Sequence, residues 1–321
     1  MQASAHPMGC GASLALALCM PLSYVALVQL FDRDGIDRNH TVSIKRRFTG
    51  AFLNNIISVG CTWMILKQGS STPLRDMGLH VDKLLNAIFF PCILMFTLYF
   101  GQFVMMFYDR TLGNCFDLKS WLRSFRSATW LRDIVLGPVT EEIAFRCCSV
   151  VLMSQCASSL ATVFLSPVPF ALSHFHHVFD DQRRGFTPQQ AFLKRTFQFA
   201  YTYIFGVFAS YLLLSTRHAL VPIVAHSICN SLGLPLLHEI GFYPKLSQRA
   251  TLWISYIAGF APPTTALAVV PEPRPLNLDG CTHFLYLASI DRFTHMSPDF
   301  WRQIGCFGGV LSNGPRVHVP R

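Results

Sequence analysis

Two adjacent carboxylates, Glu141 and Glu142, stand inside an apolar stretch of the chain, and Arg146 follows one helical turn after the second. An ionisable side chain at membrane depth is costly unless it is paired or faces a water-filled cavity. Residues four apart share one face of a helix, so Glu142 and Arg146 can form an ion pair that lets both stay in the membrane. Glu141 points about 100° away around the helix, off the face of Arg146. We therefore expect Glu141 to be the carboxylate that acts as a general base.

Further polar side chains stand at helical spacing in two later apolar stretches. His174 follows Phe170 by one helical turn, and Asn230 follows His226 at the same spacing, so each pair occupies one helix face. Taken singly, His174 is compatible with an interfacial position at a helix end. His226 with Asn230 is compatible with a hydrogen-bonding contact between membrane helices.

The depth of these residues favours a common site. At about 1.5 Å rise per residue, Glu141 and Asn230 each lie roughly 10 Å from the same membrane face, on helices that run in opposite directions. His226 is one turn deeper, and His174 lies at the mouth. All four can converge on one cavity, where Glu141 would take a proton from water and His174 would orient that water. His226 and Asn230 would then stabilise the oxyanion of an acyl bond under attack.

Other hydrolytic chemistries lack their sequence signatures. The chain has no His-Glu-x-x-His motif, and His238-Glu239 lacks the second histidine that a zinc protease needs. It also has no Gly-x-Ser-x-Gly turn to expose an activated serine. We therefore expect neither a catalytic metal nor another cofactor.

The composition is that of an integral membrane protein. Hydrophobic residues make up 51% of the 321 residues and charged residues only 13%, and the mean hydropathy is +0.37. Seven apolar runs approach the roughly 17–25 residues needed to cross a bilayer. We expect an all-α, polytopic transmembrane helical bundle of about seven or eight helices. The runs are residues 11–31, 51–66, 84–107, 134–153, 159–174, 196–214 and 219–237, with a doubtful eighth at 250–270.

The net charge of +9 is carried by loops between the apolar runs, not by a patch or stripe, which argues against a nucleic-acid partner. When the loops are assigned to alternating sides, most of their cations fall on one side. The other side receives only Lys67, Arg75, Lys83 and Arg217. Positive residues stay cytosolic during insertion, so the N-terminus is predicted to lie outside the cytosol and the cavity near Glu141 to open to the cytosol.

Eleven cysteines are scattered through helices and loops without a Cys-x-x-Cys spacing. We expect neither a zinc ribbon nor a disulfide framework, and we interpret most of these cysteines as small apolar packing residues. The first apolar run is followed by a basic loop and not by a small-residue cleavage site, so we interpret it as a true span.

Three segments in order resemble the motifs of type II CAAX prenyl endopeptidases, most closely those of the eukaryotic Ras-converting branch. Residues 38–47 also resemble the first basic loop of that branch. We expect residues 1–260 to form the membrane protease domain, with the motif core at 134–237, and residues 261–321 to form a poorly structured C-terminal tail. The three segments are 140–146 (Thr-Glu-Glu-Ile-Ala-Phe-Arg), 170–177 (Phe-Ala-Leu-Ser-His-Phe-His-His) and 226–230 (His-Ser-Ile-Cys-Asn).

The resemblance implies a multi-pass hydrolase of the endoplasmic reticulum membrane. Such an enzyme removes the aaX tripeptide from farnesylated or geranylgeranylated CAAX proteins, including small GTPases of the Ras type. The resemblance implies a glutamate-dependent protease without metal or cofactor, whose partners are prenylated proteins and membrane lipid. Carried over by motif, the catalytic residues are Glu141, His174, His226 and Asn230, and the supporting residues are Glu142, Arg146 and Phe170.

The C-terminal end departs from the family pattern. Pro262-Pro263 interrupts the last apolar run, and further prolines begin a tail without a span or motif. From the residues alone, two other functions remain open: a transporter or channel with an intramembrane proton relay, and a catalytically silent membrane scaffold. A transporter would be favoured by internal inverted repeats, and we find none.

Overall fold

The computed structural model describes residues 9–33 and 36–260, and within these residues every regular element is a helix. This confirms the predicted all-α fold. The predicted tail at 261–321 lies outside the described residues. The chain divides into two compact units, and each is considered by itself. The described parts of the first are residues 9–33, 36–88 and 136–224, and those of the second are residues 89–135 and 225–260.

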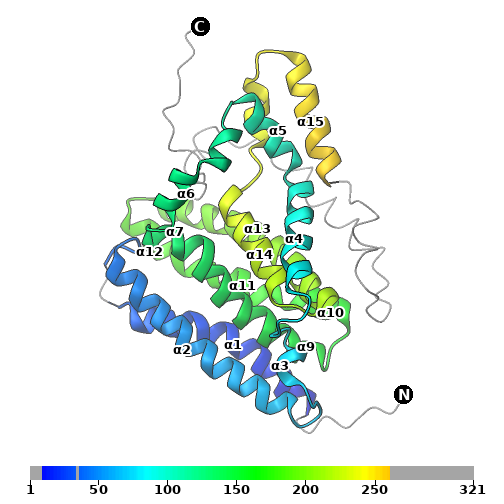
Figure 1. Ribbon diagram of the computed structural model, residues 1–321. Coiled ribbons are helices and arrows are strands. Elements are labelled where there is room, and N and C mark those ends of the chain that lie inside the picture. The colour runs from blue at the N-terminus through cyan, green and yellow to red at the C-terminus, as the bar shows by residue number, and fades with distance from the viewer. Residues whose placement is uncertain (1–8, 34–35, 261–321) are drawn as a thin grey trace. The chain divides into compact units, whose positions relative to one another are not determined.

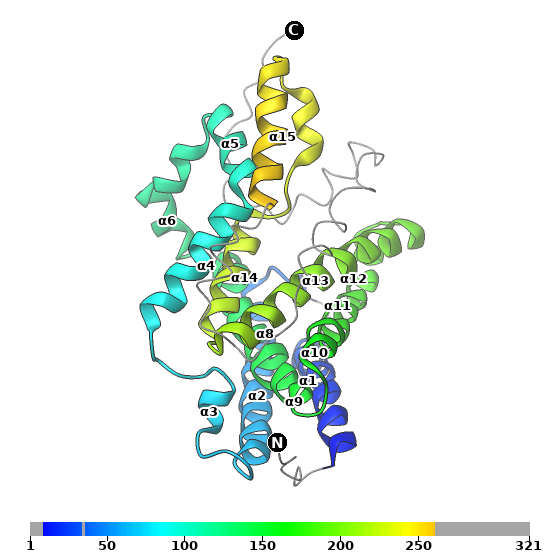
Figure 2. The same cartoon turned by 90° about the vertical axis from the view of Figure 1, so that its right-hand side faces the viewer.

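The first unit contains two long helices that lie side by side in both views, α1 (Cys10–Phe31) and α2 (Thr41–Leu66) (Figure 1, Figure 2). Gly50 permits their close approach, because a Cβ there would lie 2.7 Å from the carbonyl oxygen of Leu27. The other elements of this unit are α3 (Pro73–Asp76), α8 (Gly137–Glu142), η3 (Ile143–Val150), α9 (Val151–Ser154), α10 (Ser159–Leu165), α11 (Pro167–Ser173), η4 (His174–His176), α12 (His177–Arg183) and α13 (Pro188–Thr216).

The second unit packs α15 (Leu246–Phe260) against α5 (Phe100–Tyr108). The ring of Tyr256 covers Gly101, where a Cβ would lie 2.3 Å from the ring, and the Tyr256 hydroxyl donates to Gln102 Oε1 at 2.8 Å. The other elements are η1 (Leu112–Phe116), α6 (Leu118–Ser124), α7 (Ala128–Trp130) and η5 (Leu237–Phe242). Three helices contain the boundary between the units: α4 (Leu84–Leu98), η2 (Leu131–Leu136) and α14 (Leu220–Leu232).

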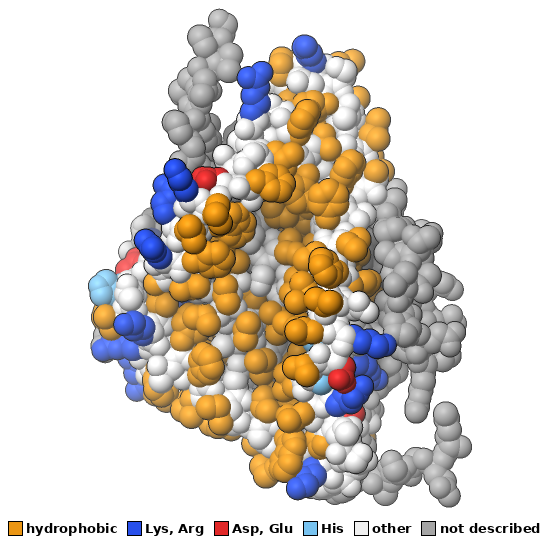
Figure 3. Space-filling model, in the orientation of Figure 1, with side chains coloured by type: hydrophobic (Ala, Val, Ile, Leu, Met, Phe, Trp, Pro, Cys, Tyr) orange, Lys and Arg blue, Asp and Glu red, His pale blue; other side chains and the backbone are white. Residues whose placement is uncertain are grey.

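Within the described residues, four helices are long and apolar enough to cross a membrane, and a fifth span is possible if α4 and α5, bent by 63°, form one. Large apolar side chains such as Ile56, Leu22 and Ile93 are exposed, as lipid-facing residues are. Hydrophobic side chains are spread over the face of the molecule that Figure 3 shows. The chain is therefore an integral membrane protein. The four candidate spans are α1 (Cys10–Phe31), α2 (Thr41–Leu66), α13 (Pro188–Thr216) and the stretch Leu220–Phe242, which comprises α14 and η5.

Two predicted spans, 134–153 and 159–174, are helical but are not among the long apolar α-helices, whose number is below the predicted seven or eight. The first changes its winding between α and π along one continuous helix, and the second is interrupted at Ser166. A proline stands at each of these irregularities. A proline has no N–H for the helical ladder, and its ring crowds the carbonyl four residues earlier. Pro138 stands in the first segment, and Pro167 begins α11 in the second.

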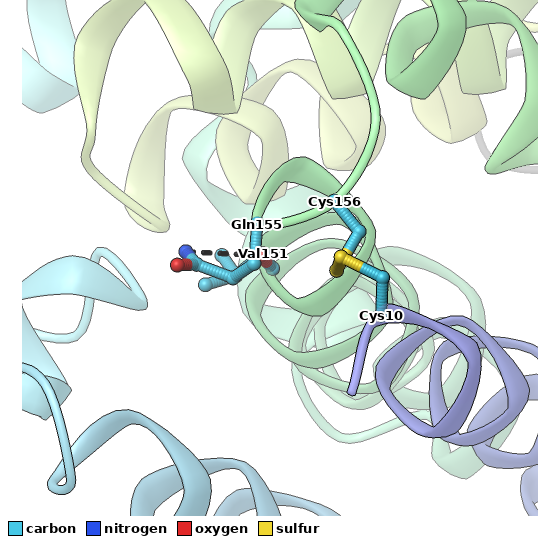
Figure 4. The surroundings of a disulfide bond; sticks show 4 residues. All are labelled: Cys10, Val151, Gln155 and Cys156. Atoms are coloured by element: carbon cyan, nitrogen blue, oxygen red, sulfur yellow. Dashed lines mark hydrogen bonds between the residues drawn. A yellow bond between two sulfur atoms is a disulfide. The ribbon is translucent and has the colours of Figure 1, made fainter. Parts of the chain in front are cut away.

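The prediction that the cysteines form no disulfide framework is wrong for one pair. Cys10, at the start of α1, is bonded to Cys156, which follows α9 (Figure 4). The two cysteines are 146 positions apart, so no local spacing motif marks the pair. None of the other described cysteines is in a disulfide. Cys147 and Cys148 are buried, as the packing interpretation predicts, whereas Cys19 is exposed and the remaining four are half-buried.

Candidate active site

The two adjacent carboxylates lie at the end of α8, between two stretches of wider π-helical winding, η2 and η3. Pro138 supplies a local cause for η2, because it cannot donate a hydrogen bond to the carbonyl of Ile134 and its ring forces that turn apart. Such π turns are rare and frequently occur at functional sites. The α-helical turns that carry the carboxylates are therefore flanked on both sides by wider π-helical turns.

The neighbouring carboxylates Glu141 and Glu142 have different environments. The side chain of Glu142 is 0% exposed and that of Arg146 is 1% exposed, and Arg146 Nη1 lies 3.2 Å from Glu142 Oε1. The predicted ion pair is confirmed. Glu141 is only half-buried. Arg146 therefore compensates the charge of Glu142. The side chain of Glu141, in contrast, is partly exposed.

Aromatic rings complete the surroundings of Arg146. Its guanidinium lies 4.5 Å from the ring centre of Phe170 and 5.8 Å from that of Phe205, distances at which a cation is attracted by the ring face. Gly206 leaves room for this packing, since a Cβ there would lie 2.6 Å from Pro167 and 3.3 Å from Arg146 Nη2. The guanidinium is thus held by a carboxylate and by aromatic faces.

Phe170 also fixes His174. Nδ1 of His174 lies 3.0 Å from the carbonyl oxygen of Phe170, and the hydroxyl of Ser173 donates to the same oxygen at 2.6 Å. A carbonyl oxygen only accepts, so Nδ1 carries the proton, and in the neutral ring Nε2 is the acceptor nitrogen. His174 is half-buried at the end of α11. Its orientation suits a ring that accepts a hydrogen bond from water.

The first unit therefore brings together four residues from two of the predicted motifs. Glu142 binds Arg146, Arg146 stacks on Phe170, and Phe170 orients His174. This chain of contacts links the helix of the carboxylates to the helix of the histidine.

His226 and Asn230 lie on α14, in the part that belongs to the second unit. His226 is buried, at 6% exposure, and Asn230 is half-buried. Asn230 Nδ2 donates to the carbonyl oxygen of Asp133 at 2.8 Å. The carboxylate of Asp133 in turn accepts two hydrogen bonds from Arg132, at 2.7 and 2.9 Å. An amide nitrogen carries two hydrogens, so this contact uses one and orients the second.

The predicted catalytic residues are thus divided between the two units. Glu141 and His174 belong to the first unit, and His226 and Asn230 belong to the second. The convergence of all four on one cavity stays a prediction.

Thr140, the residue before Glu141, has contacts that sequence reasoning missed. It is 1% exposed, and its hydroxyl donates to the carbonyl oxygen of Leu136 at 2.8 Å. The hydroxyl of Tyr24 lies 2.9 Å from Thr140 Oγ1, and it donates to that oxygen because the Thr140 hydrogen is already donated to Leu136. Asn55 Nδ2 donates to the carbonyl oxygen of Thr140 at 3.1 Å. Side chains from α1 and α2 therefore fix the backbone next to Glu141.

One signal could have found these contacts. Asn54 and Asn55 are adjacent amides inside a predicted span, and buried polar groups in a membrane helix need partners. Asn54 accepts from Ser23 at 2.7 Å, as expected of a contact between helices. Tyr24 had no comparable signal, because a tyrosine in an apolar run is ordinary.

Over the described part of the chain, no group of three or more His, Cys, Asp or Glu residues is placed to hold a metal ion.

The family model and the relatives that match this chain all point to the same protein family. The family model for type II CAAX prenyl endopeptidase Rce1-like proteins matches residues 123–232. The CAAX prenyl protease 2 of Caenorhabditis elegans is 52% identical over 251 residues, which are 78% of this chain and 94% of that protein. The human protein of the same name is 30% identical over 276 residues, 83% of each chain. The Arabidopsis thaliana protein is 30% identical over 300 residues, 84% of this chain and 93% of that protein. No solved structure matches.

Proposed function

Because the chain belongs to the type II CAAX prenyl endopeptidase family and is a membrane protease, we propose that it cleaves prenylated CAAX proteins with a water activated by Glu141. The relatives are named as CAAX prenyl proteases, which supports this substrate class. The observation that carries the mechanism is the contrast between the two carboxylates. Glu142 is buried against Arg146, whereas Glu141 is half-buried beside it. The carboxylate with access to its surroundings is the better proton acceptor.

In the proposed reaction, Glu141 removes a proton from water as the water oxygen attacks the carbonyl carbon of the prenylated cysteine, and the bond from that carbon to the nitrogen of the aaX tripeptide breaks. His174 accepts a hydrogen bond from the same water through Nε2, because Nδ1 is held by Phe170. His226 and Asn230 donate to the oxyanion as it forms. The protonated Glu141 then gives its proton to the leaving amine of the aaX tripeptide. The products are a new C-terminal carboxylate and the free tripeptide, and no metal or other cofactor takes part.

The proposed substrates are farnesylated or geranylgeranylated proteins, among them small GTPases of the Ras type. A farnesyl chain has about 15 carbons, and each buried CH₂ contributes about 0.8 kcal/mol. Burial of the lipid should therefore dominate the affinity over the short peptide. An unprenylated peptide is expected to bind poorly.

The proposed location is the endoplasmic reticulum membrane, with the cavity open to the cytosol. The distribution of loop cations supports this orientation. The Cys10–Cys156 disulfide supports it independently, because both cysteines fall on the side assigned to the lumen, and disulfides persist in oxidising compartments. Prenylated proteins are made in the cytosol, so this orientation gives the substrate direct access.

The proposal is tested with purified protein in phosphatidylcholine vesicles, a farnesylated CAAX peptide and the same peptide without the lipid. We expect mass spectrometry to detect release of the intact aaX tripeptide from the farnesylated peptide, with little release from the other. The activity should persist after treatment with a strong chelator. Loss of activity that only added Zn²⁺ restores would overturn the mechanism, and equal cleavage of both peptides would overturn the role of the lipid.

A further inference from the structure

A polar cavity in the first unit is lined by the end of α1, by Arg47 of α2 and by residues of α12. Its volume is about 730 Å³, and none of the predicted catalytic residues is among its described lining. Five arginines and three aspartates line it. The cavity therefore has an excess of positive charge that the proposed reaction does not use.

Part of this charge is already compensated. Asp32 is buried and accepts from Arg47 Nε at 2.6 Å and from the hydroxyl of Ser43 at 2.7 Å. Arg184 Nη2 lies 3.6 Å from Asp37 Oδ2, within ion-pair distance. Arg33 and Arg183, in contrast, are exposed at the cavity, and neither has an ion pair or a side-chain hydrogen bond within residues 9–33 and 36–260. Two guanidinium groups in this position favour an anion with several oxygens, such as a phosphate.

Asp32 indicates that the ligand also carries a hydrogen-bond donor. Its Oδ1 is buried and has no hydrogen-bond partner in the described part of the chain. A buried carboxylate oxygen without a partner is costly. A ligand that carries an N–H or O–H donor close to its phosphate would satisfy it.

An apolar track leads along α1 to the cavity. Leu18, Leu22, Ala26 and Leu30 are all exposed and are spaced four residues apart, so they share one face of the helix. Ala26 and Leu30 also line the cavity. α1 is long and apolar enough to cross the membrane. A ligand in the cavity can therefore place an acyl chain along this face.

We propose that the cavity binds the headgroup of an acidic glycerophospholipid that carries a hydrogen-bond donor, of the phosphatidylserine type. The phosphate lies against Arg33 and Arg183, the ammonium donates to Asp32 Oδ1, and an acyl chain follows the apolar face of α1. Under the orientation proposed above, this end of α1 faces the cytosol, the side on which acidic lipids concentrate. The binding itself does not depend on the proposed protease activity.

The test uses the full-length protein purified in a neutral detergent, titrated with phosphatidylserine or with phosphatidylcholine of the same acyl chains. Native mass spectrometry counts the bound lipid, and thermal unfolding measures stabilisation. We expect a saturable phosphatidylserine adduct and a rise in unfolding temperature, with little effect of phosphatidylcholine. Arg33→Ala with Arg183→Ala should weaken phosphatidylserine binding roughly 5-fold per arginine, on the order of 25-fold in all.

The matched control is Lys119→Ala with Arg126→Ala, which removes the same charge from exposed positions in the second unit. It should bind phosphatidylserine as the unchanged protein does. Equal weakening in both double variants, or equal binding of the two lipids, would overturn the site. Stabilisation by inorganic phosphate alone to the same extent would overturn the lipid assignment in favour of a free anion. If the double variant does not fold, Arg183→Gln alone carries the same test.

Discussion

Replacing Glu142 by glutamine removes a charge from a pair that has no contact with solvent. Glu142 and Arg146 are 0% and 1% exposed and lie 3.2 Å apart, so the change leaves the guanidinium buried without its counter-charge. Removal of one partner of a buried ion pair costs about 3–5 kcal/mol. In a chain of this size, 1 kcal/mol corresponds to about 2–4 °C in unfolding temperature. We therefore expect Glu142→Gln to lower the unfolding temperature by about 6–20 °C.

The structure supplies the reporter for this assay. Cys147 and Cys148 directly follow Arg146 and are 0% exposed, so a thiol-reactive fluorogenic dye should label them only when this helix opens. The matched control is Glu141→Gln, which changes the neighbouring half-buried carboxylate and should leave the unfolding temperature nearly unchanged while abolishing activity.

A compensating variant separates the lost charge from general damage. Glu142→Leu with Arg146→Met replaces the pair by apolar side chains of similar volume, a change that is often neutral or stabilising. This double variant should recover most of the lost stability. If Glu142→Gln unfolds at the original temperature while Glu141→Gln is strongly destabilised, the ion pair does not stabilise this helix.

Three further results are expected. Asn55→Ala leaves the buried carbonyl of Thr140 without its amide donor, so it should cost about 1–3 kcal/mol of stability and lower kcat more than it raises KM; an effect on KM alone would contradict a positioning role. Cys10→Ser opens a large covalent loop and should cost about 2–5 kcal/mol; alkylation of both Cys10 and Cys156 in unreduced protein would contradict the disulfide. A cysteine at Arg184 should react with an impermeant reagent only from the cytosolic face, and labelling from the lumen would reverse the orientation.

The helices, and one contact within a helix, follow directly from the sequence. The apolar runs predict where membrane helices lie, because a bilayer requires long apolar stretches. The four-residue spacing predicts the ion pair of Glu142 with Arg146, because such residues share a helix face. Phe170 and His174 are also four residues apart, and the backbone oxygen of Phe170 accepts a hydrogen bond from the ring of His174.

The remaining features depend on contacts between distant segments. Cys10 pairs with Cys156, and Tyr24 reaches Thr140, across sequence separations that no local pattern encodes. The π-helical winding around α8 was also missed, although Pro138 is a visible cause, because a proline in an apolar run predicts a break more readily than a widened turn. Contacts between distant segments depend on how the helices pack, and a single sequence contains little information about helix packing.

The most direct test of general-base catalysis by Glu141 is a single turnover in H₂¹⁸O, with enzyme in excess over a farnesylated CAAX peptide. If Glu141 acts as a general base, water attacks the peptide carbonyl itself, so the new prenylcysteine carboxylate should carry one ¹⁸O atom in the first turnover. Glu141→Gln should release no tripeptide. An unlabelled product, with ¹⁸O recovered in the peptide that contains Glu141, would show that the carboxylate attacks as a nucleophile and would contradict the proposed mechanism.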